Sequence, residues 1–293
     1  MSVTQGCGKL FVCATPIGNL EDITLRALRI LREVDLIAAE DTRRTRQLLT
    51  HFDIHTPLIS YHQHNTASRI PELIQRLKSG ENIAVVSDAG TPGISDPGQE
   101  LIQAAIREDL SVVPIPGPSA VITALVVAGF DTTAFVFAGF LPRGRRGKRE
   151  ALEQIAKEPR TTVAYEAPHR LLDTLELCVE LMPERPLALC REMTKVHEEV
   201  VRGNPSFLLE YFKENSPRGE FVLVFSAVEE TSVPAAVGEP GEELTIEEQV
   251  AQLLKEGYDK KTAIKTVARE RGVPKREVYS AAINLPAIPT KEH

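Results

Sequence analysis

Residues 85–98, which read VVSDAGTPGISDPG, constrain the fold of this 293-residue chain more than any other stretch. An apolar strand over 83–86 leads into them, and a helix is expected over 99–108. Glycine and proline interrupt both helix and strand, so the segment between must be a loop. Ligands of parallel α/β sheets bind outside the carboxyl ends of the strands, and glycine lets the backbone approach them closely. We therefore predict a ligand-binding loop after a central strand.

Strands and helices alternate through the first half of the chain. The predicted strands are 9–14, 36–39, 58–60, 83–86 and 111–115, and the predicted helices are 24–34, 44–52, 67–77 and 99–108. This alternation is typical of a parallel sheet with helices on its faces. Two further loops follow strands, TPIGN over 15–19 and PGPSA over 116–120. We expect all three loops to meet in one crevice of an N-terminal α/β domain, residues 1–116.

The second half has a different spacing of elements. Its predicted helices are 119–128, 149–157, 171–181 and 206–213, and its predicted strands are 134–138, 161–165, 187–190, 200–202 and 221–225. The strands lie closer together in the sequence, so we expect a mixed sheet in a second α/β domain, residues 117–228. Residues 229–243 are rich in Pro, Gly and Glu and are predicted to be a linker.

The last segment, 244–293, is predicted to be a small helical domain. Thr245 and Glu248 fit a capping box, and Asp259 suits the cap of a second helix over 260–271. A third helix is expected over 275–285, after a Gly-containing turn, as in a helix-turn-helix. From 258 to 279 there are seven Lys or Arg against three Asp or Glu. This basic balance favours contact with RNA, and a plain helical cap is the alternative.

Composition excludes several other classes of protein. The formal net charge of −7 argues against a wholly basic nucleic-acid binder, but it allows local basic patches. The longest apolar run, 120–130, is short of the ~20 residues that span a bilayer, and no signal-peptide pattern begins the sequence. The four cysteines form no C-x-x-C pair and are expected to be reduced thiols. We expect a cytoplasmic protein without a membrane segment.

The loops lack the sequence motifs that bind nicotinamide dinucleotides or nucleoside triphosphates. None of the loops reads G-x-G-x-x-G or G-x-x-x-x-G-K-[ST], which argues against nicotinamide and triphosphate sites. His62 and His64 could share a strand face, but no third metal ligand has a matching spacing. We therefore expect no metal site.

Eight segments between Ala14 and Val224 form a more specific pattern: ATPIGNLEDIT, AAEDTR, VSDAGTPGISDPG, PGPSA, GFLP, YEAPHR, REMTK and RGEFVLV. Together they resemble the tetrapyrrole-methylase superfamily of S-adenosylmethionine (SAM)-dependent methyltransferases. Within it they resemble the branch that methylates a cytidine 2′-hydroxyl of small-subunit (16S) ribosomal RNA. The resemblance implies two α/β domains with SAM between them, a helix-turn-helix appendage and a homodimer. The partner would be the ribosomal RNA or the 30S particle.

The resemblance also implies the residues that bind SAM. They are Pro16 in the first loop, Ala89, Gly90, Thr91 and Ile94 in the second, Ser119 and Ala120 in the third, and Tyr165, Glu166, Ala167, Gly219 and Glu220 in the second domain. The wider superfamily has G-D-P in the second loop, where this chain has Thr91 in place of Asp.

The chemistry of methyl transfer singles out charged side chains at the ends of strands. A ribose hydroxyl is a poor nucleophile at neutral pH and needs a base, or a cation that stabilises the developing alkoxide. The candidates are Glu40, Asp41, Asp88, Glu192 and Lys195. Glu40 and Asp41 have an alternative role as caps of the following helix. Lys195 has the alternative of an ordinary surface residue.

Basic residues are the candidates for contact with RNA phosphates. They are Arg43, Arg143, Arg145, Arg146, Arg170, Lys260, Lys261, Lys275 and Arg276. The run 143–149 is either a solvated linker or a phosphate-binding loop, and its interleaved glycines favour mobility. Two other functions stay open on the same fold: methylation of another acceptor, such as a tetrapyrrole carbon, and a non-catalytic RNA-binding assembly factor.

Overall fold

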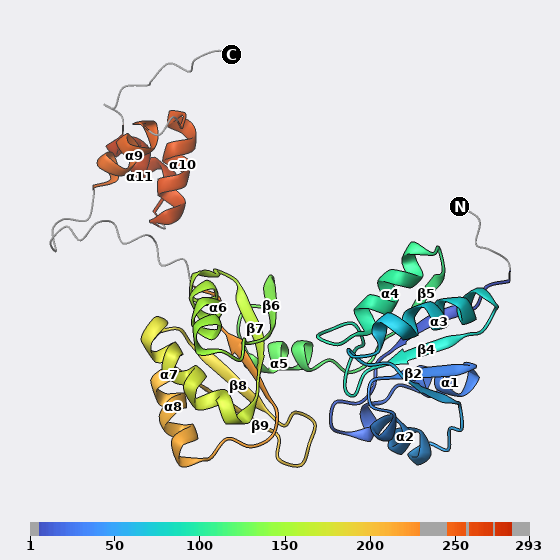
Figure 1. Cartoon of the computed structure of the whole chain (residues 1–293). Helices are drawn as coiled ribbons and strands as arrows, with labels where there is room; N and C mark the ends of the chain where they lie inside the picture. Colours follow the sequence, from blue (N-terminus) through green and yellow to red (C-terminus); the bar gives the residue numbers. More distant parts are fainter. Residues whose placement is uncertain (1–5, 229–244, 256–257, 272, 283–293) are drawn as a thin grey trace. The chain divides into compact units, whose positions relative to one another are not determined.

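The computed structural model describes residues 6–228, 245–255, 258–271 and 273–282. The chain divides into two compact units, residues 1–230 and residues 231–293 (Figure 1). The first unit contains both sheets, and the described part of the second is helical. The predicted linker, 229–243, lies outside the described residues.

The first sheet is parallel throughout, as the alternation predicts. Its strands are β1 (Lys9–Cys13), β2 (Leu36–Ala39), β3 (Leu58–Ser60), β4 (Ile83–Val86) and β5 (Ser111–Ile115). They lie in the order β3-β2-β4-β1-β5, so β4 is central. Because all five run the same way, the loops after β1, β4 and β5 leave from one edge of the sheet.

Helices cover both faces of this sheet. They are α1 (Leu25–Glu33), α2 (Thr42–His51), α3 (Thr66–Lys78) and α4 (Gly98–Arg107), with a short helix η1 (Leu20–Asp22) before α1. In β2, Leu36 and Ala38 pack with α3 and α4, whereas Ile37 and Ala39 pack with α1 and α2. This alternation follows from the two-residue period of a strand, and it explains why β2 and β4 are apolar along their whole length.

The second sheet is mixed, as expected. Its strands are β6 (Phe135–Phe140), β7 (Thr161–Glu166), β8 (Leu187–Arg191), β9 (Glu199–Gly203) and β10 (Phe221–Phe225). The order is β6-β7-β10-β8-β9, in which only β6 and β7 are parallel among the described strands.

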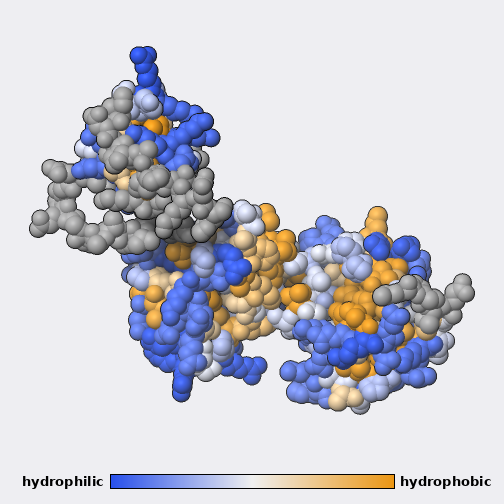
Figure 2. All heavy atoms as spheres, turned by 90° about the horizontal axis from the view of Figure 1, so that it is seen from above, coloured by the Kyte–Doolittle hydropathy of each residue, from blue (hydrophilic) through white to orange (hydrophobic). Residues whose placement is uncertain are grey.

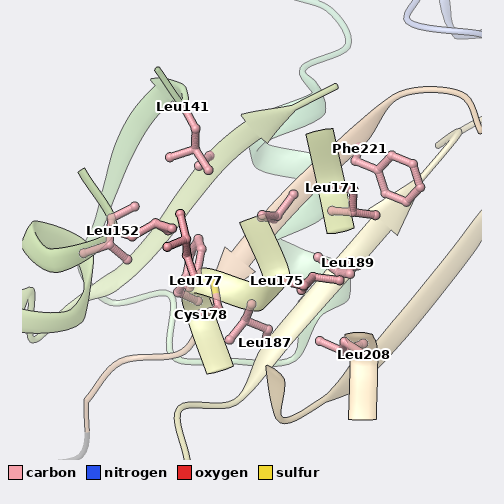
Figure 3. Packing of buried hydrophobic residues seen from close by; sticks show 14 of the residues in the cluster. Leu141, Leu152, Leu171, Leu175, Leu177, Cys178, Leu187, Leu189, Leu208 and Phe221 are labelled. Carbon is pink, nitrogen blue, oxygen red and sulfur yellow. The ribbon is translucent and has the colours of Figure 1, made fainter. Parts of the chain in front are cut away.

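One face of the second sheet is covered by α6 (Arg145–Lys157), α7 (Leu171–Leu181) and α8 (Pro205–Glu214). Figure 3 shows this core, in which Leu152, Leu175 and Leu208 from the three helices meet side chains of the strands. The opposite face is covered by α5 (Ala120–Ala128), and a short helix η2 (Pro168–Arg170) precedes α7.

The basic run 143–149 is not the mobile loop that its glycines suggest. The predicted helix 149–157 begins four residues earlier, at Arg145, with Gly144 at its N-cap. A Cβ on Gly147 would lie 3.2 Å from Cβ of Pro142, so this glycine permits close packing. Lys148 is buried, with only 3% of its surface exposed. Gly147 therefore allows α6 to pack closely against Pro142, and only part of the run 143–149 faces solvent.

The helical unit contains α9 (Ile246–Lys255), α10 (Lys260–Glu270) and α11 (Lys275–Ala281). The capping box is present, because the Thr245 amide donates to Glu248 Oε2 and the Glu248 amide donates to Thr245 Oγ1. Asp259 caps α10 as predicted. The third helix is shorter than expected in the described residues, and 283–293 lie outside them.

Candidate functional site

The three loops at the edge of the first sheet are tied together by hydrogen bonds. The Thr15 amide donates to the Gly90 carbonyl at 2.9 Å, and the Gly90 amide donates back at 3.0 Å. Gly90 has φ +85°, a conformation that favours glycine. The Thr91 hydroxyl donates to the Pro118 carbonyl at 3.3 Å. The residue that replaces the superfamily's Asp thus joins the second loop to the third.

These loops and the second sheet enclose a cavity of about 390 Å³. Ten of the twelve predicted cofactor residues line it: Ala89, Gly90, Thr91, Ile94, Ser119, Ala120, Tyr165, Glu166, Ala167 and Glu220. Glu40 and Asp88 also line it. Pro16 and Gly219 do not. Ile17 takes the place expected for Pro16, and Gly219 lines a separate hollow beside Glu192.

Sequence reasoning missed ten lining residues. They are Ile17, Arg44, Ser87, Ser95, Asp96, Phe140, Pro168, Met193, Phe221 and Val222. Several lie inside the quoted segments, so the signal was there: Asp96 belongs to SDPG, and Phe140 to GFLP. Asp96 accepts hydrogen bonds from the amides of Gly93 and Gly98, at 2.8 and 2.7 Å, and burial raises its pKa. It holds the shape of the second loop.

The acidic candidates of the first sheet have different roles. Asp41 caps α2, accepting from the Arg43 amide at 2.8 Å, and the hydrogen bond from the Arg43 side chain lowers its pKa to about 2. This is the capping alternative, and it leaves Asp41 a weak base. Asp88 accepts from the Asp41 amide at 2.9 Å and pairs with Arg44 at 3.4 Å. Glu40 faces the cavity, where burial and the charge of Asp88 raise its pKa.

Lys195 lies between two carboxylates at the end of the second sheet. Its Nζ is 2.9 Å from Glu192 Oε1 and 3.0 Å from Glu220 Oε2. Burial disfavours the charge on Lys195, but these hydrogen bonds outweigh it and raise the Lys195 pKa. Burial likewise opposes the charge on Glu192, yet the hydrogen bonds from Lys195 and the Glu220 amide lower the Glu192 pKa. At neutral pH Lys195 is therefore a cation, and its charge is held by the carboxyl groups of Glu192 and Glu220.

The backbone around Lys195 is strained. Glu192 has φ +49° and Thr194 has φ +67°, the left-handed region that costs non-glycine residues free energy. Such strain persists only where neighbouring contacts impose it, and it is found preferentially at functional sites. One of those contacts comes from Gly18 of the first loop. Its backbone approaches so closely that a Cβ added to Gly18 would lie 2.5 Å from Lys195 Cγ and 2.8 Å from Thr194 Oγ1. The first loop therefore lies directly against Lys195.

Glu166 lines the cavity, but its carboxylate is engaged below the surface. It is fully buried and accepts from the Thr174 hydroxyl at 2.6 Å and the Ala167 amide at 2.9 Å. Arg170 Nε lies 3.1 Å from it and Lys148 Nζ 3.4 Å. A buried carboxylate needs such partners, so this group holds the end of β7 in place.

The predicted RNA-contacting residues fall into three groups. Arg43 is exposed at the start of α2 and pairs with Asp41. Arg143, Arg145 and Arg146 are exposed before and within the first turn of α6, whereas Arg170 is partly buried against Glu166. Lys260, Lys261, Lys275 and Arg276 open α10 and α11 in the helical unit.

The chain belongs to the family of tetrapyrrole (corrin/porphyrin) methylases, whose model matches residues 9–206. Its sequence is 47% identical to ribosomal RNA small subunit methyltransferase I of Halalkalibacterium halodurans, over 93% of this chain and 94% of that protein. It is 47% identical to the protein of the same name from Synechocystis, over 96% of this chain and 99% of that one. The namesake from Thermotoga maritima is 49% identical, over 76% of this chain and 100% of its own length.

Solved structures share the fold at low sequence identity. A cobalt precorrin-4 methyltransferase superposes with a TM-score of 0.58 at 17% identity, covering 74% of this chain and 94% of its own. Uroporphyrin-III C-methyltransferase of Thermus thermophilus, solved with S-adenosylhomocysteine, has a TM-score of 0.52 at 16% identity, covering 75% and 97%. The two-sheet architecture is therefore that of the methylase fold.

Proposed function

We propose that this chain transfers a methyl group from SAM to the 2′-hydroxyl of a cytidine in small-subunit ribosomal RNA. Two observations carry the proposal: a loop-walled cavity whose lining residue Glu220 pairs with Lys195, and relatives that are 47% identical in sequence. Those relatives are named ribosomal RNA small subunit methyltransferase I. The different acceptors in the names of the solved neighbours carry less weight, because those chains share only the fold.

The residues of the cavity fit SAM. Its volume lies within the range of pockets for small ligands, ~300–1,000 Å³. Ser119 makes no side-chain cap bond to α5, so its hydroxyl and the first amides of α5 are available to a carboxylate. Asp88 and Asp96 suit an ammonium group, and Tyr165 with apolar neighbours suits an adenine. Bound there, SAM supplies an electrophilic methyl group on a sulfonium.

Lys195 provides the electrostatic part of the mechanism. As the ribose oxygen forms its new bond to carbon, its hydroxyl proton leaves and negative charge develops on the oxygen. An ammonium group held in advance stabilises that charge without reorganisation. Glu192 and Glu220 orient Lys195, and the lowered pKa of Glu192 makes it a poor proton acceptor. Glu40, whose pKa is raised by burial, is a better general base than Glu192.

We propose that RNA contacts come from the exposed arginines near α6, from Arg43 and from the basic starts of α10 and α11. The cations of these segments supply the salt-dependent attraction to phosphates. The substrate is the ribosomal RNA or the 30S particle, in the cytoplasm. The four cysteines are free thiols, in keeping with a reducing compartment. Within the described residues, no helix is long and apolar enough to cross a membrane.

We propose that the protein is a homodimer with α5 at its interface. Val121, Ala124, Leu125 and Ala128 of α5 are buried on the second sheet, whereas Ile122 and Val126 on its other side are 49% and 66% exposed. A helix that is apolar all round is ordinarily buried on all sides, and a second copy would cover this face. Figure 2 shows apolar side chains (orange) exposed among hydrophilic ones (blue) on the α/β unit.

Product mapping tests the reaction. Small-subunit RNA is methylated in a single turnover with radiolabelled SAM and is then hydrolysed with alkali. A 2′-O-methyl group blocks cleavage at its own phosphodiester, so the label should stay in an uncleaved dinucleotide. Cleavage at the labelled nucleotide would refute the ribose assignment.

Lys195→Met tests the role of the cation. Because the cation acts on charge that develops in the transition state, we expect kcat to fall by about 10²–10³, with little change in the KM for either substrate. The measurement is steady-state methylation by the variant and the wild type. Turnover at the wild-type rate would remove Lys195 from the mechanism.

A further inference from the structure

A second cavity, of about 810 Å³, adjoins the proposed cofactor pocket. Its lining residues are Phe140, Leu141, Pro142, Arg143, Ala167, His169 and Arg170. Phe140 and Ala167 also line the cofactor pocket, so the two spaces share a wall. The ionisable side chains in this lining are all basic, and the rest are apolar. The cavity therefore combines an apolar surface with positive charge, the two features that a nucleotide needs.

The ring of Phe140 is placed by a local irregularity of β6. Residues 137 and 140 are three apart and would face opposite sides of a regular strand. A register shift between Phe137 and Gly139, with Gly139 at φ +69°, changes this. Both rings now pack against Tyr165, with centroids 5.2 and 5.0 Å away. Bulges often re-aim a side chain beside a functional site, and here Phe140 stays 61% exposed.

The walls of this cavity are held rigidly. Arg170 Nη2 donates to the carbonyls of Leu141 and Pro142 at 2.6 and 2.7 Å, and Arg170 also pairs with buried Glu166. Leu141 is anchored in the core of the second sheet (Figure 3). The guanidinium of Arg170 is thus used to shape the cavity. Arg143 and His169 are exposed on its rim, where they can reach a ligand.

We propose that this cavity, here named the base cavity, holds the cytosine of the target nucleotide stacked on Phe140. Arg143 and His169 contact its flanking phosphates, and the ribose lies at the wall shared with the cofactor pocket. The proposal rests on the proposed function and adds to it the site that binds the acceptor. Sequence-specific recognition of RNA mostly targets single-stranded segments with unstacked bases, and an exposed aromatic ring replaces the stacking that such a base lacks.

Three variants of β6 test the base cavity. Phe140→Leu keeps an apolar wall for the cofactor pocket but removes the ring, Phe140→Trp keeps a ring, and Phe135→Leu alters a partly exposed phenylalanine of the same strand outside both cavities. Stacking on an aromatic side chain is worth about 5- to 150-fold in affinity per base. We expect Phe140→Leu to raise the KM for RNA by that factor, Phe140→Trp to restore it, and Phe135→Leu to leave it unchanged.

A binding assay separates stacking from catalysis. The probe is an RNA with a fluorescent cytidine analogue at the nucleotide that the wild-type protein methylates, bound in the presence of S-adenosylhomocysteine. Quenching by the wild type and by Phe140→Trp, but not by Phe140→Leu, is the expected result. Calorimetry with SAM should show a smaller loss of affinity in Phe140→Leu than the loss for RNA.

The outcomes distinguish the two proposals. If wild-type protein methylates the RNA ribose and Phe140→Leu keeps normal KM and quenching, the base cavity is refuted and the proposed function stands. An equal loss of SAM and RNA affinity would make Phe140 a wall of the cofactor pocket only, which also refutes it. If the wild type methylates no RNA, both proposals fail.

Discussion

Gly18→Ala tests whether the contact between the first loop and Lys195 matters for catalysis. The new Cβ would lie 2.5 Å from Lys195 Cγ and 2.8 Å from Thr194 Oγ1. Ordinary carbon–carbon contacts begin near 3.4–4.0 Å, so the lysine stem has to move by roughly 1 Å. The backbone conformation of Gly18 is not the left-handed one, so the effect comes from the contact and not from backbone strain.

The size of the effect follows from that displacement. Lys195 Nζ lies 2.9 Å from Glu192 and 3.0 Å from Glu220, and a displacement of Nζ by about 1 Å would take both distances beyond hydrogen-bond range. A misplacement of about 1 Å in a catalytic group can cost about 10²-fold in rate. We therefore expect kcat to fall by about 10- to 100-fold, while SAM affinity measured by calorimetry changes little.

A double-mutant cycle with Lys195→Ala isolates the cause. That variant removes Cγ, so Gly18→Ala should cost much less in its background, and only the contact with Thr194 remains. The assay is single-turnover methylation of RNA by the four proteins, with Gly144→Ala as a control at a glycine that has open space around it. Additive losses, or wild-type kcat in Gly18→Ala, would refute the reasoning, because the contact would then not position Lys195.

Three more outcomes are expected. Gly90→Val should abolish SAM binding, because a β-branched side chain is strained at its φ of +85° and would lie in the cavity; retained calorimetric affinity in the folded variant would contradict the site. Removal of residues 244–293 should weaken RNA binding more than SAM binding. The truncation should also make RNA binding less dependent on salt. The slope of the logarithm of the binding constant against the logarithm of the salt concentration should fall by about 0.7 for each phosphate that the truncated protein no longer neutralises. Unchanged RNA affinity would make the unit a structural cap. Val126→Asp should halve the mass measured by light scattering, while Ile106→Asp, exposed on α4, should not; a wild-type monomer would remove the dimer proposal.

The amino-acid sequence by itself determined the local structure and the class of fold. Clusters of glycine and proline interrupt both helices and strands, so the loops after β1, β4 and β5 could be predicted from their residues alone. The alternation of strands and helices likewise predicted the parallel first sheet, and the closer spacing of the strands in the second half predicted the mixed second one. The caps at Thr245 and Asp259 were predictable because a capping side chain acts within three residues.

The tertiary structure alone decided how charged and aromatic side chains are used. Lys148 and Glu166 turned out to be a buried pair, and Lys195 a cation resting against Gly18. The bulge that exposes Phe140 has no sequence signal that we recognised. These roles depend on which distant segments meet, and the energy of a charge depends on its burial and partners more than on its neighbours in the chain. Local patterns carry no record of either.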